Sequence, residues 1–576
     1  MQDDDRRRIT LRRRALWKGA LGWLVVALAV RALSAVWVTH PGYMDAYYYF
    51  HLASNLAVGR GLVEDVIWNY LTPPVSVPRP GGAYWPPGTA VLAALPALAA
   101  SWLGLPLIWG WRLAQAMPVI ASSLVVAGAY AMSRRLVPDG AAARRAHTVT
   151  ALTLLSGVYF PYWVTTDTFT PFALLGGGAL WLSAEAAVMA SDARWRWHVA
   201  GAGLMAGLAQ GVRPDAGLLL VAPLIAAGVR SEGASAAGIG RRARWVAILA
   251  AGFAIGAAPW LARNWVTWGS LTPPGGSAAL WLREYDDLFA FLEQPGAARW
   301  LDAGPGAALE ARLHALAGNL GVLGQPLLYY LTVPAAVGLW RMRHRPALWP
   351  VAGYLVLLYT VMSLVFPFQG VRGGFFHSLA AVLPWLLLWA VSGVEALVGA
   401  AARRRRWHEA EAQRAFVGAL VAFGALSSLY FLGHLTARWD ARLAAYRAVG
   451  AWLDVHAPGG ARVLVADPPG FWYATGRAAA VLPSDGLDAL LAAAGQFGAD
   501  YVAVEPAAPR YLAALRQGET APAELARVAT VGEIQLYRIW HDALLATRRS
   551  LLCLGRERQA SEKPSPWPCA SRGSSE

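Results

Sequence analysis

Long apolar segments alternate with short polar ones along most of the chain. A hydrocarbon core about 30 Å thick requires a helix of about 17 to 25 mainly apolar residues. About eleven segments meet this requirement, at residues 15–38, 107–133, 147–164, 168–190, 197–212, 215–230, 244–262, 325–341, 347–366, 376–400 and 414–434. The pattern therefore predicts a polytopic α-helical membrane protein with a transmembrane domain over residues 15–434.

Arginine-rich clusters occur at every second connection between these segments and indicate the orientation. They are the runs in the basic N-terminus (residues 1–14), SRRL with AARRAH, RWRWH, RRAR, RMRHR and RRRR. Such clusters favour the cytoplasmic side. The alternation holds only if residues 89–105 do not cross the membrane, so we predict a helix there in the outer interface, after Pro86 and Pro87. Loops 39–106 and 263–324 and everything after about residue 435 are then predicted to lie outside.

The pattern changes near residue 440, where short helical and strand-like segments begin to alternate and continue to a last strand, IQLYRI. This alternation predicts a small extracytoplasmic α/β domain over residues 435–546. Nucleotide-binding motifs of the G-x-G-x-x-G or G-K-[ST] type do not occur in it. The polar tail, residues 547–576, is predicted to be disordered.

Composition agrees with a membrane protein: 56% of residues are hydrophobic, 15% are charged and the mean hydropathy is +0.38. We predict a multi-pass protein of the plasma (inner) membrane. The net charge of +15 resides largely in the orienting clusters, so nucleic acid is not expected as a partner. The basic N-terminus resembles the front of a signal peptide, but the following apolar run is too long, and we interpret it as a retained first span. Both cysteines, Cys553 and Cys569, lie in the tail.

Two carboxylates are candidates for chemistry at the outer face. Asp45, in HPGYMDAYYYFHLASNLAVGRGL, begins a predicted interfacial helix that ends near Gly59 and Gly61. Asp167, in WVTTDTFTPF, lies at the outer end of a predicted span. Ionisable groups near membrane depth are functional candidates. The alternative for each is a structural role as the N-cap of the following helix.

Four cationic or titratable groups are also predicted to face outward. Outward arginines run against the inside bias and favour an anionic ligand such as a lipid phosphate. The alternatives are an ion pair of Arg213 with Asp215, or a bridge to membrane lipid without catalytic role. The residues are Arg213, Arg263, Arg372 and His377.

Two further features favour structural roles. The glycines at 176–178 lie within a predicted span and indicate close helix packing. Arg31, inside the first span, is predicted either to extend toward the interface or to pair with a carboxylate of the first loop.

These residues together resemble the GT-C glycosyltransferases of the protein mannosyltransferase and aminoarabinose transferase type. The resemblance rests on an arginine in the first span, on Asp45 opening an aromatic helix, and on the motifs YWPPGTAVLAALPAL, TTDTFTPFALL, GVRPDAGLLL and LARNWVTWGSLTPPGG. It covers roughly residues 15–400. The outer soluble domain is similar in plan.

The resemblance implies transfer of a sugar from a polyprenyl-phosphate-linked donor to an acceptor (a lipid, a glycan or a protein) on the outer face. It implies that Asp45 is the base that activates the acceptor hydroxyl, and that Asp167 helps to hold the acceptor or a divalent metal. Arg213, Arg263 and Arg372 would neutralise the departing lipid phosphate. Many members have an acidic pair where this chain has Asp45 and Ala46, so metal dependence stays open.

Two other classes of function compete with this hypothesis. One is a lipid or sugar transporter without transferase activity, which would favour inverted repeats and paired broken helices that the sequence does not display. The other is a scaffold membrane protein, in which the outer Asp and Arg residues would be scattered. Convergence of Asp45 with Asp167 or Arg372 separates the enzyme from both.

Overall fold

The structure is a computed structural model that describes residues 2–72, 75–229, 236–519 and 521–540. The predicted disordered tail and both cysteines lie outside the described residues. The chain divides into two units. The first contains residues 1–64, 78–288 and 295–442, and the second contains residues 65–77, 289–294 and 443–576.

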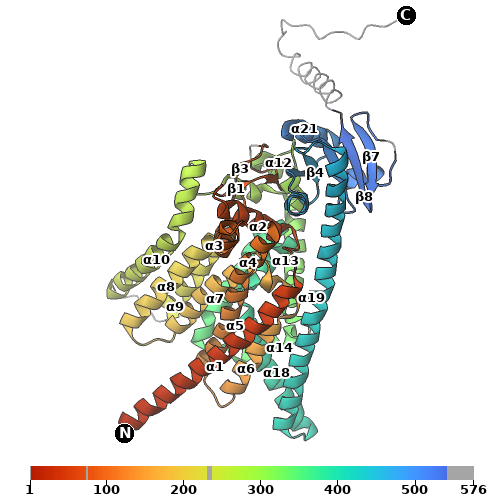
Figure 1. Cartoon of the computed structure of the whole chain (residues 1–576). Helices are drawn as coiled ribbons and strands as arrows, with labels where there is room; N and C mark the ends of the chain where they lie inside the picture. The colour runs from red at the N-terminus through yellow and green to blue at the C-terminus, as the bar shows by residue number, and fades with distance from the viewer. Residues whose placement is uncertain (1, 73–74, 230–235, 520, 541–576) are drawn as a thin grey trace, which may run out of the picture. The chain divides into compact units, whose positions relative to one another are not determined.

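The first unit is built of helices (Figure 1). Their bounds are α1 (Gln2–Trp37), α2 (Met44–Ala57), α3 (Gly88–Trp102), α4 (Leu107–Ala114), α5 (Ala116–Leu136), α6 (Ala142–Leu155), α7 (Phe169–Ala186), α8 (Asp192–Gln210), α9 (Val221–Val229), α10 (Ala236–Trp268), α11 (Pro274–Ala278), α12 (Ala297–Asp302), α13 (Gly304–Gly324), α14 (Thr332–Arg341), α15 (Trp349–Leu364), α16 (Pro367–Gln369), α17 (Phe375–Leu379), α18 (Leu383–Arg405) and α19 (Glu409–His456). A two-stranded antiparallel ribbon joins β1 (Val63–Glu64) to β3 (Arg79–Pro80).

Fewer helices than expected are long and apolar enough to cross a membrane. Within the described residues there are six, or seven when a bent pair is counted as one span, against about eleven predicted. The protein is an integral membrane protein, but the exact count is not confirmed. One reason is that apolar runs are interrupted: the helix predicted over 147–164 ends at Leu155, where Ser156 is left-handed, and continues as short 3-10 turns.

Part of the predicted outer loop 263–324 is helical. Helix α10 continues to Trp268, and the segment from Gly304 is already helical. Helix α13 with its short extension to Leu327 meets α14 at an angle of 90°. The two helices form a broken span or a re-entrant segment.

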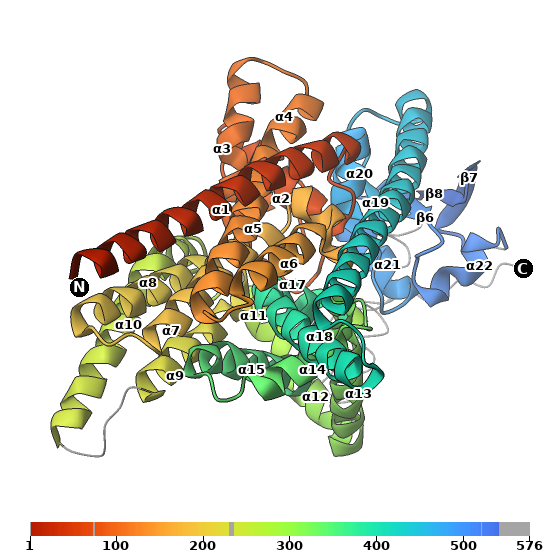
Figure 2. The same cartoon turned by 90° about the horizontal axis from the view of Figure 1, so that it is seen from below.

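Close glycine contacts hold the bundle together. Helices α8 and α10 are the most extensively packed pair, and a Cβ added to Gly207 or Gly256 would collide with the backbone of the other helix. Small residues four apart let helices approach in this way in membranes. Figure 2 shows α1 running alongside α5, with which it is also packed.

The close packing predicted for the glycines at 176–178 is observed, whereas neither role predicted for Arg31 is. Gly176 and Gly177 lie against Ala381, as expected for close packing. For Arg31 both alternatives were wrong: its side chain is fully buried, donates to the Leu154 carbonyl at 2.7 Å and lies over the rings of Phe160 and Trp163. A cation at the carboxyl end of α6 is favoured by the helix dipole.

The second unit contains a six-stranded mixed sheet in the order β2-β5-β4-β6-β8-β7. Its strands are β2 (Val66–Ile67), β4 (Val463–Val465), β5 (Ala479–Val481), β6 (Tyr501–Val504), β7 (Leu525–Val531) and β8 (Ile534–Ile539), with helices α20 (Pro468–Thr475), α21 (Leu487–Phe497) and α22 (Ala513–Arg516). Strand β8 lies where the last strand was expected. Sequence analysis did not anticipate that loop residues 66–67 supply an edge strand, parallel to β5. The last segment of the second unit begins at Leu443, inside the continuous helix α19.

Candidate active site

Two acidic side chains from distant parts of the first unit meet at one histidine. The Nε2 atom of His377 lies 3.0 Å from Oδ2 of Asp167 and 3.6 Å from Oδ2 of Asp45. Asp167 is buried, with 1% of its side chain exposed, whereas 29% of the Asp45 side chain is exposed. The buried Asp167 carboxylate is therefore suited to holding the His377 imidazole in place. The more exposed Asp45 carboxylate is suited to contacting a ligand.

Hydrogen bonding defines the protonation state of His377. Its Nδ1 atom lies 2.8 Å from the carbonyl oxygen of Gly373, which can only accept, so Nδ1 must carry a proton. Nε2 faces the carboxylate of Asp167, which accepts a hydrogen bond in its ionised form. Both nitrogens therefore donate, and the ring is an imidazolium. The ring of Phe169 stacks on it at a centroid distance of 4.0 Å, which also favours a cation.

The electrostatics of the pair agree with this assignment. Burial alone would raise the pKa of Asp167, but the charge and hydrogen bond of His377 and hydrogen bonds from Tyr43 and the Thr168 amide lower it below its ordinary value. Burial alone would lower the pKa of His377, but Asp167 raises it above its ordinary value. Both groups lie outside the helices long enough to span a membrane. Asp167 and His377 therefore form an ion pair.

Helix α2 places Asp45 in its first turn. Tyr43 occupies the N-cap position of α2, so the alternative that Asp45 is the N-cap does not hold. A carboxylate in the first turn is still favoured by the helix dipole. The helix ends at Ala57, before the left-handed Gly59 and Gly61, close to the predicted end.

Asp167 precedes α7, whose N-cap is Thr168. Its Oδ1 atom accepts a hydrogen bond from the Thr168 amide, and its Oδ2 atom accepts one of 2.7 Å from the Tyr43 hydroxyl. The carboxylate is therefore held by three donors, counting His377, and cannot turn without losing them.

A glycine-rich turn positions His377. Residues Gly370–Gly374 form a π-type turn immediately before α17, and Gly373 within it has φ +128°, a conformation that favours glycine. This turn directs the Gly373 carbonyl toward His377 Nδ1. The sequence QGVRGGFFH thus encodes the orientation of the imidazole.

Arg213 is committed to protein contacts. Its Nε atom pairs with Asp215 at 2.9 Å, and Nη2 donates to the Gly374 carbonyl at 3.0 Å. The Asp215 carboxylate in turn accepts from the Ser378 hydroxyl. The predicted ion pair of Arg213 with Asp215 is therefore present. It binds Gly374 and Ser378, which lie on either side of His377 in the chain.

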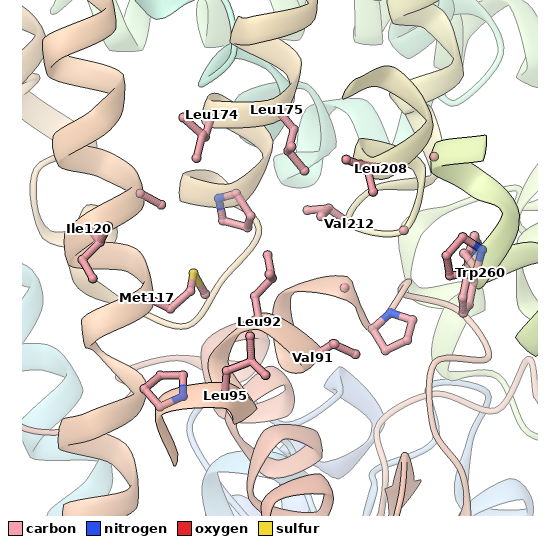
Figure 3. Close-up of a pocket in the computed structure, with 18 of the residues that line it drawn as sticks. Val91, Leu92, Leu95, Met117, Ile120, Leu174, Leu175, Leu208, Val212 and Trp260 are labelled. Carbon is pink, nitrogen blue, oxygen red and sulfur yellow. The ribbon is translucent and has the colours of Figure 1, made fainter. Parts of the chain in front are cut away.

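Arg263 lines an apolar groove, shown in Figure 3. The groove has a volume of about 660 Å³ and lies between α3, α5, α7, α8 and α10. Arg263 is its charged lining residue. Its Nη2 atom donates to the Gly81 carbonyl, and its buried Nη1 atom has no hydrogen-bond partner among the described residues. An anion at the groove would satisfy that donor.

Arg372 lies at the surface. Its side chain is 60% exposed, 3.8 Å from the equally accessible Asp286, and stacks over Tyr285. Exposed pairs of this kind contribute little to stability. The three arginines that the sequence grouped together therefore have three different environments.

Three residues around the cluster were not predicted from the sequence: Tyr43, which donates to Asp167, Ser378, which donates to Asp215, and Trp439, whose ring lies 5.4 Å from that of Tyr43. Tyr43 could have been found, because it is only two residues from Asp45 in an aromatic stretch. Trp439 comes from α19, and no local pattern indicated its contact.

The cluster also fits a divalent cation. Asp45, Asp167 and His377 each offer one ligand atom, and these atoms lie within 4.8 Å of one another. A histidine that donates Nδ1–H to a backbone carbonyl presents Nε2 as metal ligands usually do. Metal binding would replace the Nε2 proton.

Comparison with known proteins identifies the fold. No protein-family model matches the chain, and no curated protein matches its sequence. Two crystal structures resemble it across almost its whole length: ArnT from Cupriavidus metallidurans bound to undecaprenyl phosphate, with a TM-score of 0.54, and the same protein in the apo state, with a TM-score of 0.55. Each is 13% identical, covers 90% of this chain and is itself covered over 97% and 98% of its length, respectively.

The chain therefore shares the fold of these two crystal structures. Within that fold it is similar to ArnT, and the resemblance indicated by the sequence is confirmed at the level of the fold.

Proposed function

We propose that this protein is a membrane glycosyltransferase that moves a sugar from a polyprenyl-phosphate-linked donor to an acceptor hydroxyl at the outer face of the plasma membrane. The observation that carries the proposal is the convergence of Asp45 and Asp167 on His377, with all three ligand atoms within 4.8 Å. Scattered outer carboxylates, as in a scaffold protein, would not meet in this way.

Asp45 is the general base of the proposed reaction. His377 has both ring nitrogens engaged, to Gly373 and to Asp167, so it holds no free lone pair for a substrate proton. The Asp167 carboxylate is enclosed and already accepts three hydrogen bonds. Asp45 is the accessible carboxylate, and it accepts the proton of the acceptor hydroxyl while that oxygen attacks the anomeric carbon.

The Asp167–His377 pair orients and tunes Asp45. The Nε2 atom of His377 lies 3.6 Å from the Asp45 carboxylate, and Asp167 balances the positive charge of the ring. A base held ionised in a fixed position needs no reorganisation when the acceptor arrives. If a divalent cation binds, Asp45, Asp167 and His377 would hold it, and it would supply positive charge for an anionic leaving group.

The donor lipid lies in the groove of Figure 3, with its phosphate at Arg263. The unpartnered Nη1 atom of Arg263 supplies a charge-assisted hydrogen bond to the departing phosphate. Almost the whole remaining lining is apolar, as an isoprenoid chain requires. One of the similar crystal structures is described as bound to undecaprenyl phosphate, which supports a lipid of this class here.

The groove and the carboxylate cluster are connected by short links. Arg263 donates to the carbonyl of Gly81, and the amide of the next residue, Gly82, donates to the Tyr48 hydroxyl at 3.0 Å. Tyr48 lies on α2, three residues from Asp45. The loop of Gly81 and Gly82 thus ties the proposed phosphate site to the helix that carries the base.

The test compares lipid-linked sugars and cell-envelope glycans by mass spectrometry in cells with and without the gene. Loss of the gene should cause one polyprenyl-phosphate sugar to accumulate and one glycan to lose that sugar. The deletion is complemented with wild type, with Asp45→Asn, or with Asp302→Asn as a matched control, since Asp302 is an exposed carboxylate on α12.

Wild type and Asp302→Asn should restore the glycan, and Asp45→Asn should not. Restoration by Asp45→Asn, with the donor lipid still consumed, would exclude Asp45 as the base of the transfer. Unchanged lipid-linked sugars in the deletion strain would refute the proposed donor class.

A further inference from the structure

A second, smaller cavity lies next to the groove inside the helix bundle. It has a volume of about 170 Å³ and is bordered by α5, α7, α8 and the start of α18. Leu124 and Leu174 line both spaces, so the groove and the inner cavity adjoin at these side chains. In Figure 3, Leu174 points into the groove from α7.

Two glycines of α7 are among the residues that line the inner cavity. Gly177 and Gly178 line it on the side of α7. A Cβ on Gly177 would lie 3.9 Å from the ring of Trp385, and a Cβ on Gly178 would collide with the side chain of Met205. A side chain at position 177 would therefore extend toward Trp385, and one at position 178 would displace Met205.

The sequence had indicated only helix packing for this glycine run. Gly176 fits that role, because it contacts Ala381 directly. A Cβ on Gly177 would lie 3.4 Å from the Ala381 carbonyl oxygen, and Gly178 lies against the side chain of Met205. The glycines therefore allow close packing, and Gly177 and Gly178 also line the inner cavity.

The lining of the cavity defines the chemistry of its occupant. It is formed by aliphatic, methionine and tryptophan side chains and offers almost no polar surface. Apolar cavities of this kind do not hold ordered water and instead bind hydrocarbon. Left empty, the cavity would cost packing energy.

We infer that the inner cavity receives a distal segment of the donor's isoprenoid chain, which enters from the groove between Leu124 and Leu174. The inference rests on the proposed function. The groove provides a cation at Arg263 and an apolar path beyond it, and the inner cavity continues that path into the bundle. The inner cavity then selects lipids whose chain is long enough to reach it.

The test measures binding of two prenyl monophosphates to the purified full-length protein in detergent. Farnesyl phosphate is a drug-sized molecule that a groove of this volume can hold by itself. Undecaprenyl phosphate is long enough to reach further. The variants Gly177→Leu and Met205→Phe each fill the inner cavity from a different helix, and Gly177→Ala is the matched control.

Both filling variants should weaken binding of undecaprenyl phosphate by at least about tenfold, because burying only two methylene groups contributes that much. Binding of farnesyl phosphate should change by less than about twofold, as should both affinities in Gly177→Ala. Thermal unfolding of each variant checks that it is folded, and two filling variants are used so that one can fail without loss of the test.

Equal changes for the two lipids would overturn the inference while leaving the proposed donor intact. The same variants are tested with dioleoyl phosphatidic acid, and an equal or larger loss for that lipid would assign the cavity to a membrane acyl chain and overturn the inference. If wild type binds neither prenyl phosphate, the proposed donor class fails and the inference fails with it.

Discussion

The hydroxyl of Tyr43 donates a hydrogen bond of 2.7 Å to the carboxylate of Asp167, although 124 residues separate them in the chain. Tyr43 is also the N-cap residue of the helix that carries Asp45. Tyr43 therefore connects the two carboxylates. The position of the exposed Asp45 depends, through Tyr43, on the buried Asp167.

Replacement of Tyr43 by Phe tests this connection. The change removes one of the donors to a buried carboxylate, which costs about 1.5 to 3 kcal/mol. The pKa of Asp167 should rise, because Tyr43 helps to lower it. We expect a lower unfolding temperature and an acid limb of the rate profile displaced to higher pH. Tyr162→Phe is the control, since Tyr162 contacts Tyr43 edge-on and its hydroxyl is not one of the donors to Asp167 among the described residues. Identical profiles for both variants would contradict the proposed link.

Replacement of Asp45 by Asn separates catalysis from helix stability. Asn is similar in size, so the fold should be retained, and the proton acceptor is lost. General-base catalysis contributes roughly a hundred to ten-thousandfold, so transfer should fall by that factor while the unfolding temperature stays near wild type. A variant that keeps more than about a third of the wild-type rate would exclude Asp45 as the base.

Arg213, Arg263 and Arg372 should respond differently to replacement by Ala. Arg213→Ala leaves Asp215 buried without its cation and should destabilise the protein by about 3 to 5 kcal/mol. Arg263→Ala should weaken donor binding about tenfold or more with little change in stability, because a charge-assisted bond to phosphate is lost. Arg372→Ala should change stability by less than about 0.5 kcal/mol, because its ion pair is exposed. Thermal unfolding and donor titration measure both quantities. Equal effects of all three on donor affinity would support the undivided phosphate site predicted from the sequence.

The Asp167–His377 pair predicts a stability maximum in mildly acidic solution. The pKa of Asp167 is lowered by folding, so its contribution is complete above about pH 4 and is lost as the pH falls through the folded-state pKa. The pKa of His377 is raised by folding, so its contribution is complete below about pH 6.5 and is lost as the pH rises through the folded-state pKa. Unfolding temperatures in detergent should therefore be highest between these limits. His377→Gln should flatten the alkaline side, and His314→Gln, at an exposed site on α13, should not. If neither variant flattens the alkaline side of the stability profile, the Asp167–His377 pair does not cause the pH dependence.

The orientation of the chain follows from the arginine clusters and can be checked by reporter fusions. A reporter fused after residue 440 should be active only outside the cytoplasm, and one fused near Gly140 only inside. The reverse result would move Asp45, Asp167 and His377 to the cytoplasmic side and would require a different donor.

The sequence by itself determined that this is a helical membrane protein, because apolar length and composition are local properties. It also indicated Asp45, Asp167 and His377 as candidates, because charged groups next to apolar segments stand out in the pattern. The left-handed Gly373 and the aromatic α2 are likewise encoded locally.

Tertiary structure decided which candidates meet. Arg213, Arg263 and Arg372 looked alike in the sequence, but one is paired with Asp215, one lines the groove and one is exposed. Breaks such as the one at Ser156 and the bend after α13 could not be read from hydropathy, because neighbouring helices stabilise them. The bond from Tyr43 to Asp167 and the space at Gly177 arise from packing between segments far apart in the chain. Local pattern fixes what each segment is, whereas long-range packing fixes what each side chain touches.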